Sequence, residues 1–158
     1  MKSYFFIQIL VIQIPQIKIL AVGKIKESCI LEGIHEYLKR MRGKIDILEV
    51  KDSTKEKEGI EIAGKLEKLD GFLAAALDEH GKEFTSLEFS EFIKANSNRS
   101  ICFIIGGPDG LDRSVLEKTD HVLSLSRMTL THEMARLLLV EQLYRAFSII
   151  EGKKYHRG

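Results

Sequence analysis

The chain has 158 residues, of which 44% are hydrophobic and 30% are charged, and its formal net charge is +1 at pH 7. This length allows one domain with a substantial core, and the near-neutral charge excludes a globally basic field, so a nucleic-acid partner would have to meet local patches. Cys29 and Cys102 form no CxxC pair and no Cys/His cluster. We therefore expect buried free thiols, a reducing cytoplasmic location and no metal site.

An apolar stretch precedes the first regular pattern of the chain. Residues 1–16 are as hydrophobic as a signal peptide, but they contain a single lysine, interleaved glutamines and no small-residue cleavage site. The stretch is also too short and too interrupted to span a membrane. We predict an N-terminal extension over 1–16, which is an added strand, a frayed arm or a mis-assigned start of translation, and a folded domain over 17–158.

From residue 17 onward, strand patterns alternate with helix patterns. The run 71–77 alone is compatible with a helix, and its place between two helical patterns favours a strand. Thr85 followed by Glu88 has the spacing of a capping box. In chain order we expect a strand over 17–23, a helix around 31–41, a strand over 45–50, a solvated helix within 52–70, a strand over 71–77, a turn over 78–82, a short helix around 87–93, a strand over 101–105, a short helix near 114–118, a strand over 122–125 and a long helix over 132–150.

Strands that alternate with helices predict an α/β fold in which a mostly parallel sheet carries helices on both faces. In such sheets a ligand binds outside the carboxyl ends of the strands. Two loops at these ends are candidates for a ligand-binding site. The first, Gly106-Gly107-Pro108-Asp109-Gly110, either brings backbone close to a ligand or is only a tight turn. It is neither a GxGxxG fingerprint nor a P-loop, which disfavours a dinucleotide or P-loop nucleotide site.

The second loop, 125–130, mixes apolar and polar residues in what should be an exposed connection. Such a loop suits a pocket for a half-apolar ligand, although its apolar residues could equally tuck under the next helix. That helix carries a wide apolar face, which suggests a second subunit, and Glu141 with Arg145 has the spacing of a structural ion pair. The basic, aromatic tail 153–157 could contact phosphate and stack on a base, or could be disordered.

These motifs resemble one known family. The segments IIGGPDGL, LSLSRMTLTHEMARLLLVEQLYRAFSIIEG and YHR, with the opening strand IKILAVGK, are similar to the ribosomal RNA large-subunit methyltransferase H family of the SPOUT class. The resemblance covers residues 17–157. It implies a homodimer with a C-terminal trefoil knot, which uses S-adenosyl-L-methionine to methylate the N3 ring nitrogen of a pseudouridine in 23S rRNA of the ribosome. Family members lack residues 1–16 and usually have proline where this chain has Lys154.

The resemblance also implies site residues. The cofactor would contact Leu77, Gly106, Leu125, Ser126, Arg127, Met128, Thr129 and Leu130. The tail Tyr155-His156-Arg157 would approach the pocket of the partner subunit. As a mechanism we predict that His156 removes the ring proton while Arg136 and Arg157 stabilise the anion. Alternatives are a non-catalytic RNA- or ribosome-binding dimer on the same scaffold, and a small α/β enzyme acting on a small ligand.

Overall fold

Strands and helices alternate along the chain, and this confirms the predicted α/β fold. The computed structural model describes residues 13–157. Each element is placed by its own pattern, with short β-branched runs in the strands and amphipathic segments in the helices. In chain order they are β1 (Ile17–Val22), α1 (Ser28–Arg40), β2 (Ile45–Val50), α2 (Lys55–Glu67), β3 (Leu73–Glu83), α3 (Ser86–Ala95), β4 (Ile101–Ile105), α4 (Arg113–Leu116), β5 (His121–Ser124) and α5 (His132–Ile150).

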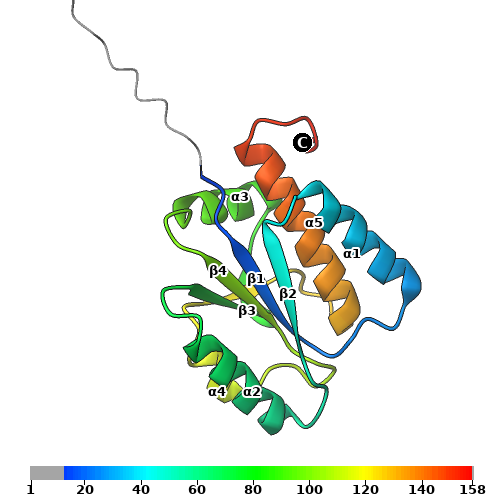
Figure 1. The fold of residues 1–158 in the computed structure, drawn as a ribbon, viewed down its shortest axis with the longest axis vertical. Coiled ribbons are helices and arrows are strands. Elements are labelled where there is room, and N and C mark those ends of the chain that lie inside the picture. Colours follow the sequence, from blue (N-terminus) through cyan, green and yellow to red (C-terminus); the bar gives the residue numbers. More distant parts are fainter. Residues whose placement is uncertain (1–12, 158) are drawn as a thin grey trace, which may run out of the picture.

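The five strands form one parallel sheet in the order β2-β1-β4-β3-β5. Because successive side chains of a strand point to opposite faces, the sheet has a core on each side. One core packs under α1, α3 and α5 around residues such as Ile19 and Phe103, and the other packs under α2 and α4 around Leu20 and Ile104. Figure 1 shows these two helical layers, with α1 and α5 side by side on one face.

The helices begin where the sequence provides caps. The Thr85 side chain accepts a hydrogen bond from the Glu88 N–H while the Glu88 carboxylate accepts one from the Thr85 N–H, so the predicted capping box is confirmed. Thr131 caps α5 by accepting from the Met134 N–H. This cap fixes the point at which the chain turns from the 125–131 loop into the long helix.

The largest difference from the predicted elements is at β3. The segment 78–82, predicted as a turn, continues the strand to Glu83. The pairing of β3 with β5 shifts register between Leu77 and Lys82, which leaves a bulge. Gly81 permits it, because a Cβ there would lie 2.5 Å from the backbone carbonyl carbon of Leu123. The polar residues 78–83 therefore continue β3, and Lys82 and Glu83 pair with β5.

Smaller corrections concern the ends of three other elements. The second helix occupies only Lys55–Glu67 within the predicted 52–70, since the polar residues around it form its N-cap loop and its C-terminal turn. The fourth helix is Arg113–Leu116, and β5 is His121–Ser124, one residue earlier than predicted. The predicted burial of both thiols was wrong for Cys29, which is exposed on α1. Cys102 is buried in β4, and burial raises the pKa of its thiol to about 12.

The wide apolar face of α5 is largely used inside the subunit. Leu139, Leu143 and Phe147 are buried in the core beneath α1 and α3, and Val140 is buried with them. The width of this face therefore does not by itself require a partner. Met134, at 37% exposure, is the large apolar side chain that α5 leaves most open. The homodimer stays a prediction.

Residues 13–16 join the domain just before β1. Ile14 packs against the core that α1, α3 and α5 cover, and the Gln16 carbonyl accepts a hydrogen bond from the Ile101 N–H. The remainder of the predicted extension, 1–12, lies outside the described residues. Within residues 13–157, no helix has both the length and the apolar composition needed to cross a membrane.

Candidate functional site

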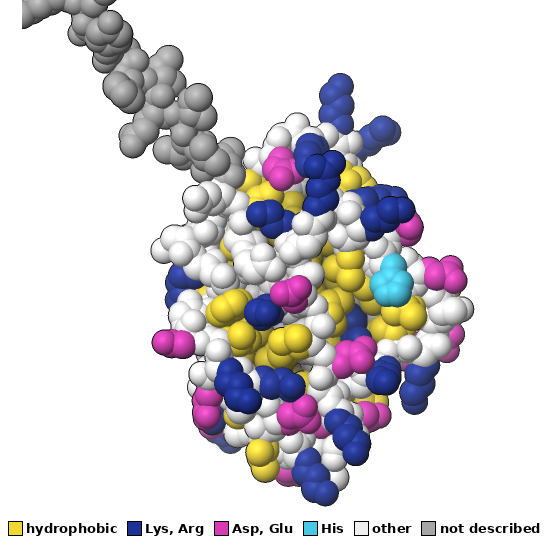
Figure 2. Space-filling view, in the orientation of Figure 1, with side chains coloured by type: hydrophobic (Ala, Val, Ile, Leu, Met, Phe, Trp, Pro, Cys, Tyr) yellow, Lys and Arg dark blue, Asp and Glu magenta, His cyan; other side chains and the backbone are white. Residues whose placement is uncertain are grey.

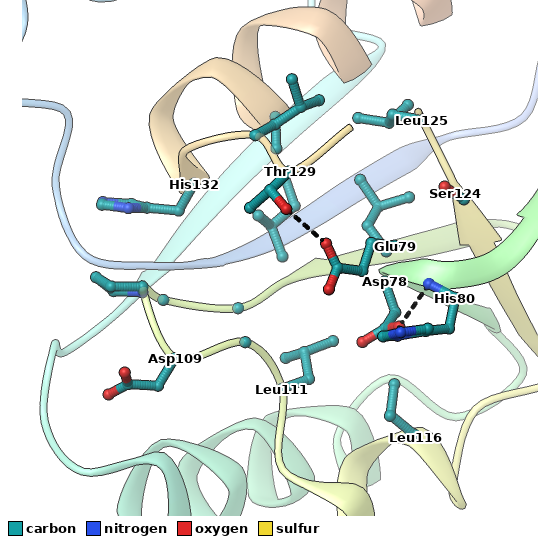
Figure 3. Close-up of a pocket in the computed structure, with 18 of the residues that line it drawn as sticks. Asp78, Glu79, His80, Asp109, Leu111, Leu116, Ser124, Leu125, Thr129 and His132 are labelled. Atoms are coloured by element: carbon teal, nitrogen blue, oxygen red, sulfur yellow. Dashed lines mark hydrogen bonds and ion pairs between the residues drawn. The ribbon is translucent and has the colours of Figure 1, made fainter. Parts of the chain in front are cut away.

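A pocket of about 690 Å³ opens at the carboxyl ends of β3, β4 and β5 (Figure 3). This is the edge at which a parallel sheet binds ligands, and the volume is that of a small-molecule site. The Gly106–Gly110 loop, the end of β3 and the 125–130 loop line it together with the first turn of α5. Segments far apart in the sequence thus meet where the strand order predicts.

The glycine loop is tight as well as pocket-lining. Gly110 N–H donates to the Gly107 carbonyl at 3.0 Å. A Cβ on Gly106 would lie 2.7 Å from the Gly110 carbonyl carbon. Glycine at 106 is therefore required by the packing of the loop against itself, and the loop presents backbone to the pocket in that conformation. The turn and the ligand-binding interpretation are both compatible with this geometry.

The structure brings seven of the eight predicted cofactor residues to this pocket. They are Leu77, Gly106, Leu125, Ser126, Met128, Thr129 and Leu130. Arg127 is the exception, because its side chain is 86% exposed and its Nε lies 3.7 Å from the Glu83 carboxylate on β3. Ser126 orders the loop by accepting from the Met128 N–H at 3.0 Å, while its carbonyl accepts from the Ser124 hydroxyl. Binding of a cofactor by these residues stays a prediction.

Polar residues in the second half of β3, directly after Leu77, were not predicted as site residues from the sequence. Asp78, Glu79 and His80 line the pocket. The Thr129 hydroxyl donates to the Glu79 carboxylate at 2.9 Å, and Asp78 accepts from the His80 backbone N–H (Figure 3). The sequence did contain an indication of this part of the site, since polar residues directly follow the apolar run that ends at Leu77. Leucine walls next to carboxylates suit a ligand with a flat apolar part and hydroxyl or cationic groups.

The start of α5 closes the side of the pocket nearest β1. His132, the first residue of the helix, lines the pocket, and its Nε2 would lie 3.7 Å from a Cβ placed on Gly23. Glu133 is buried, and its carboxylate accepts from the backbone N–H groups of Lys26 and Glu27. These hydrogen bonds, foremost that from Glu27, lower the pKa of Glu133. The loop after β1 is therefore fixed to the helix that carries His132.

Arg136, predicted as an electrostatic helper, is not among the pocket-lining residues. It is 2% exposed, and its Nη2 donates to the carbonyl of Gly23 at 2.8 Å and to that of Val22. Its Nη1 donates to Glu49 at 3.1 Å, while its buried Nε has no partner in the described structure. Burial lowers the pKa of Arg136, and the hydrogen bond to Glu49 opposes this shift. These contacts hold the carboxyl ends of β1 and β2.

The tail begins at the end of α5 that is opposite the pocket and folds back along the helix. It reaches Glu141, which lies nine residues, or about 14 Å of helix, beyond His132. The Tyr155 hydroxyl donates to Glu141 at 3.1 Å, and its ring packs at 4.6 Å from that of Tyr144. Arg157 is exposed, and Figure 2 shows lysine and arginine side chains gathered around this end of the molecule. Tail and pocket are thus not brought together within one chain.

Arg145 is a residue whose relation to the tail the sequence did not indicate. Its guanidinium donates to Glu141, as the spacing predicted, but it also contacts Nδ1 of His156 at 3.3 Å and lies 4.8 Å from the ring centre of Tyr155. The hydrogen bond to Glu141 raises the pKa of Arg145. A permanent cation therefore lies beside two of the three predicted catalytic side chains of the tail, Tyr155 and His156.

No group of three or more His, Cys, Asp or Glu side chains within residues 13–157 is arranged to hold a metal ion. The chemistry of the pocket is that of apolar walls, carboxylates and backbone. Organic ligands are therefore the class that this part of the chain suits.

Comparison with known proteins places this architecture in a family. The family model described as "Predicted SPOUT methyltransferase" matches residues 16–156. A ribosomal RNA large subunit methyltransferase H of Prochlorococcus marinus is 44% identical over 140 residues, which cover 89% of this chain and 94% of the relative. The protein of the same description from Carboxydothermus hydrogenoformans is 42% identical, covering 90% of this chain and 99% of that one.

A solved structure supports the fold. It is described as a probable methylase family protein from Haemophilus influenzae, and it superposes with a TM-score of 0.60 at 18% identity, covering 92% of this chain and 72% of that chain. At this identity the likeness concerns the fold alone. The family match over nearly all described residues and the identity to curated relatives carry the assignment: the chain belongs to the SPOUT methyltransferase family.

Proposed function

We propose that the protein is an S-adenosyl-L-methionine-dependent methyltransferase that methylates the N3 ring nitrogen of a pseudouridine in 23S rRNA. The observation that carries the proposal is the meeting of the glycine loop and the 125–130 loop in one pocket. Two relatives more than 40% identical over most of the chain are described as ribosomal RNA large subunit methyltransferase H, which supports an rRNA substrate.

The pocket residues fit this cofactor. Its adenine is flat and apolar, and leucine side chains of β3, of α4 and of the loops after β4 and β5 form the walls. Its ribose hydroxyls and its positive charge suit the carboxylates of Asp78, Glu79 and Asp109, which line the same space. Glycines 106 and 107 let backbone approach a bound group without an intervening side chain. When bound, S-adenosyl-L-methionine supplies an electrophilic methyl group, so that a C–N bond forms as the sulfonium C–S bond breaks.

The path of the chain supports a C-terminal knot, which belongs to this proposal. β5 is at one edge of the sheet, separated from β1 by β3 and β4. The helix that follows β5 nevertheless starts at the carboxyl end of β1, where Arg136 binds the carbonyls of Val22 and Gly23. The 125–131 segment must therefore cross the ends of β3 and β4, where the glycine loop lies. A crossing of this kind is what threading one loop through another requires.

A homodimer would complete the active site. Tyr155 and His156 lie against Glu141 and Arg145, so about 14–20 Å of helix separates them from His132 and the pocket of their own chain, and a catalytic tail has to come from a second subunit. In the dimer, Tyr155 stacks on the target base, and His156 and Arg157 contact its polar edge and the phosphate backbone. The cations of Arg145 and Arg157 favour loss of the N3 proton, because they stabilise the anion that remains. Water takes this proton.

Two measurements test the function. Isothermal titration with S-adenosyl-L-methionine is expected to show one site per subunit, whereas a non-catalytic RNA-binding dimer or a small-molecule enzyme of another class would show none. Mass mapping of 23S rRNA from a deletion strain is expected to reveal one pseudouridine that has lost a methyl group. An unchanged methylation pattern would overturn the proposed substrate, and absence of binding would overturn the proposed cofactor.

A further inference from the structure

The tautomer of His156 follows from its neighbour. Nη1 of Arg145 lies 3.3 Å from Nδ1 of the imidazole. A guanidinium has N–H donors and no acceptor, so Nδ1 must be the acceptor of this hydrogen bond. The neutral ring then carries its proton on Nε2, and Nε2 is the nitrogen left to face a substrate.

The arginine that sets this tautomer is itself fixed. Glu141 accepts from Nε of Arg145 at 3.1 Å and from Nη2 at 2.5 Å, which leaves Nη1 for the histidine. Arg145 also lies over the Tyr155 ring at 4.8 Å. The single Tyr155 hydroxyl proton goes to Glu141, so Tyr37 on α1 is the donor in the 3.1 Å contact between the two tyrosine hydroxyls. Side chains from α1, α5 and the tail thus form one frame around His156.

A histidine in this state is unsuited to remove a proton. Its Nε2 already bears a hydrogen, and its Nδ1 lone pair is occupied by Arg145. It is well suited to donate. When a uracil-type ring loses the N3 proton, the negative charge spreads onto the two carbonyl oxygens that flank N3. A donor aimed at such an oxygen stabilises the reacting anion in the manner of an oxyanion hole.

We propose that His156 acts as a hydrogen-bond donor, through Nε2–H, to a ring oxygen beside the reacting nitrogen, in place of the general base that the sequence suggested. Arg145 is its positioning residue, held by Glu141. The N3 proton leaves to water, and the ring anion attacks the methyl carbon. This inference rests on the proposed function, and it names the role of one side chain in that same site.

Two amide substitutions separate donor from base. Glutamine can place an N–H donor near the position of Nε2, whereas asparagine is shorter and places its amide near Nδ1; neither amide is a base. We expect His156→Gln to retain methyl transfer within about tenfold of wild type, and His156→Asn and His156→Ala to lose about 100-fold or more. Equal loss in all three variants would overturn the donor role. Affinity for the cofactor and the melting temperature should stay nearly unchanged, because His156 is proposed to contact the target base and not the cofactor.

A nuclear magnetic resonance measurement identifies the tautomer of His156 and does not require methyl transfer. In a long-range ¹H–¹⁵N spectrum recorded at about pH 8, Nδ1 of His156 should give the shift of an unprotonated nitrogen and Nε2 that of a protonated one. The resonance is assigned by its loss in His156→Gln. In Arg145→Met the two shifts should move toward the average of mixed tautomers, and in Arg145→Lys, which keeps a donor, less so.

The outcomes of these experiments distinguish the tautomer assignment and the donor role from the proposed function on which they rest. A proton on Nδ1 in the wild type would overturn the tautomer assignment, and shifts that do not respond to Arg145→Met would overturn the positioning role of Arg145. An active wild type with an inactive His156→Gln would overturn the donor role alone. A wild type that binds no cofactor and transfers no methyl group would instead overturn the proposed function, and the donor role with it.

Discussion

The carboxylate of Glu133 accepts a hydrogen bond from the backbone N–H of Lys26 at 3.1 Å, although 107 residues separate the two in the sequence. The same carboxylate accepts from the next N–H, so one buried side chain of α5 satisfies two donors that precede α1. The loop after β1 is thereby held against the helix that carries His132. Hydrogen bonds between two segments that are distant in the sequence therefore fix the start of α5, which forms one wall of the pocket.

Removing the charge of Glu133 should make stability less dependent on pH. Its pKa is lowered in the folded state, so it contributes stability that is present above the unfolded pKa and is lost as the pH falls through the folded pKa. We expect Glu133→Gln to cost about 1–3 kcal/mol at pH 7. The melting temperatures of variant and wild type should converge as the pH falls through the lowered pKa of Glu133 in the folded wild type.

Glu32, exposed on α1, gives a matched control for the loss of one carboxylate. Thermal unfolding of Glu32→Gln should follow the wild type across the pH range. A constant gap between Glu133→Gln and wild type down to acid pH would mean that the ionised form is not what stabilises the loop.

Gly106→Val should abolish cofactor binding while the domain stays folded. A Cβ at this position meets the Gly110 backbone, so the loop must move away from the conformation that lines the pocket. Titration with S-adenosyl-L-methionine measures the loss, and circular dichroism checks the fold. Gly64→Ala on α2 is the control, because nothing lies within 4 Å of its added Cβ. It should bind normally and gain up to about 1 kcal/mol of stability. Normal binding by Gly106→Val would show that the site is elsewhere.

The meeting of the two loops was predictable because parallel strands end at one edge of the sheet. Nothing in the pattern fixed which side chains point inward, and Arg127 points away toward Glu83. The extension of β3 was missed because polar residues after Leu77 match turn chemistry. Its cause is the close backbone approach of Gly81 to Leu123, a contact between segments about 40 residues apart that no local pattern encodes.

The contacts of the tail could likewise be predicted only in part from local sequence patterns. The i, i+4 spacing predicted the ion pair between Glu141 and Arg145, and the structure confirms it. The contact of Arg145 with His156 depends on the chain turning back after α5, a turn in which Gly152 has a positive φ and the Lys153 N–H donates to the Ser148 carbonyl. The glycine was visible in the sequence, but the side chain that it would bring onto Arg145 was not.

Deleting residues 1–12 should leave the melting temperature and the activity nearly unchanged. The sequence pattern placed the domain boundary at residue 17, but Ile14 and Gln16 contact the core and β4. A deletion of residues 1–16 is therefore expected to be the more damaging of the two, since it removes an apolar contact and a carbonyl acceptor. Comparing both truncations by thermal unfolding tests this order. A large loss for the shorter deletion would make residues 1–12 an integral part of the domain.

The protein should be a dimer at micromolar concentration. A tail whose side chains lie about 14–20 Å along α5 from their own pocket has a catalytic role only if a second pocket is within reach. Light scattering measures the mass directly. A monomer that is fully active would remove both the dimer and the shared site.

Mixing two defective subunits tests whether the tail acts across the interface. A His156→Ala chain keeps a sound pocket, and a Gly106→Val chain keeps a sound tail. In a two-fold dimer of the two, one composite site unites the sound pocket with the sound tail, and the other unites both defects. With random exchange of equal amounts, half of the dimers are mixed and each has one working site, so activity should return to about a quarter of the wild-type value. If each tail serves its own subunit, every site carries a defect and the mixture stays inactive. Native mass spectrometry confirms that mixed dimers form, so an inactive mixture that contains them would rule out the arrangement across the interface.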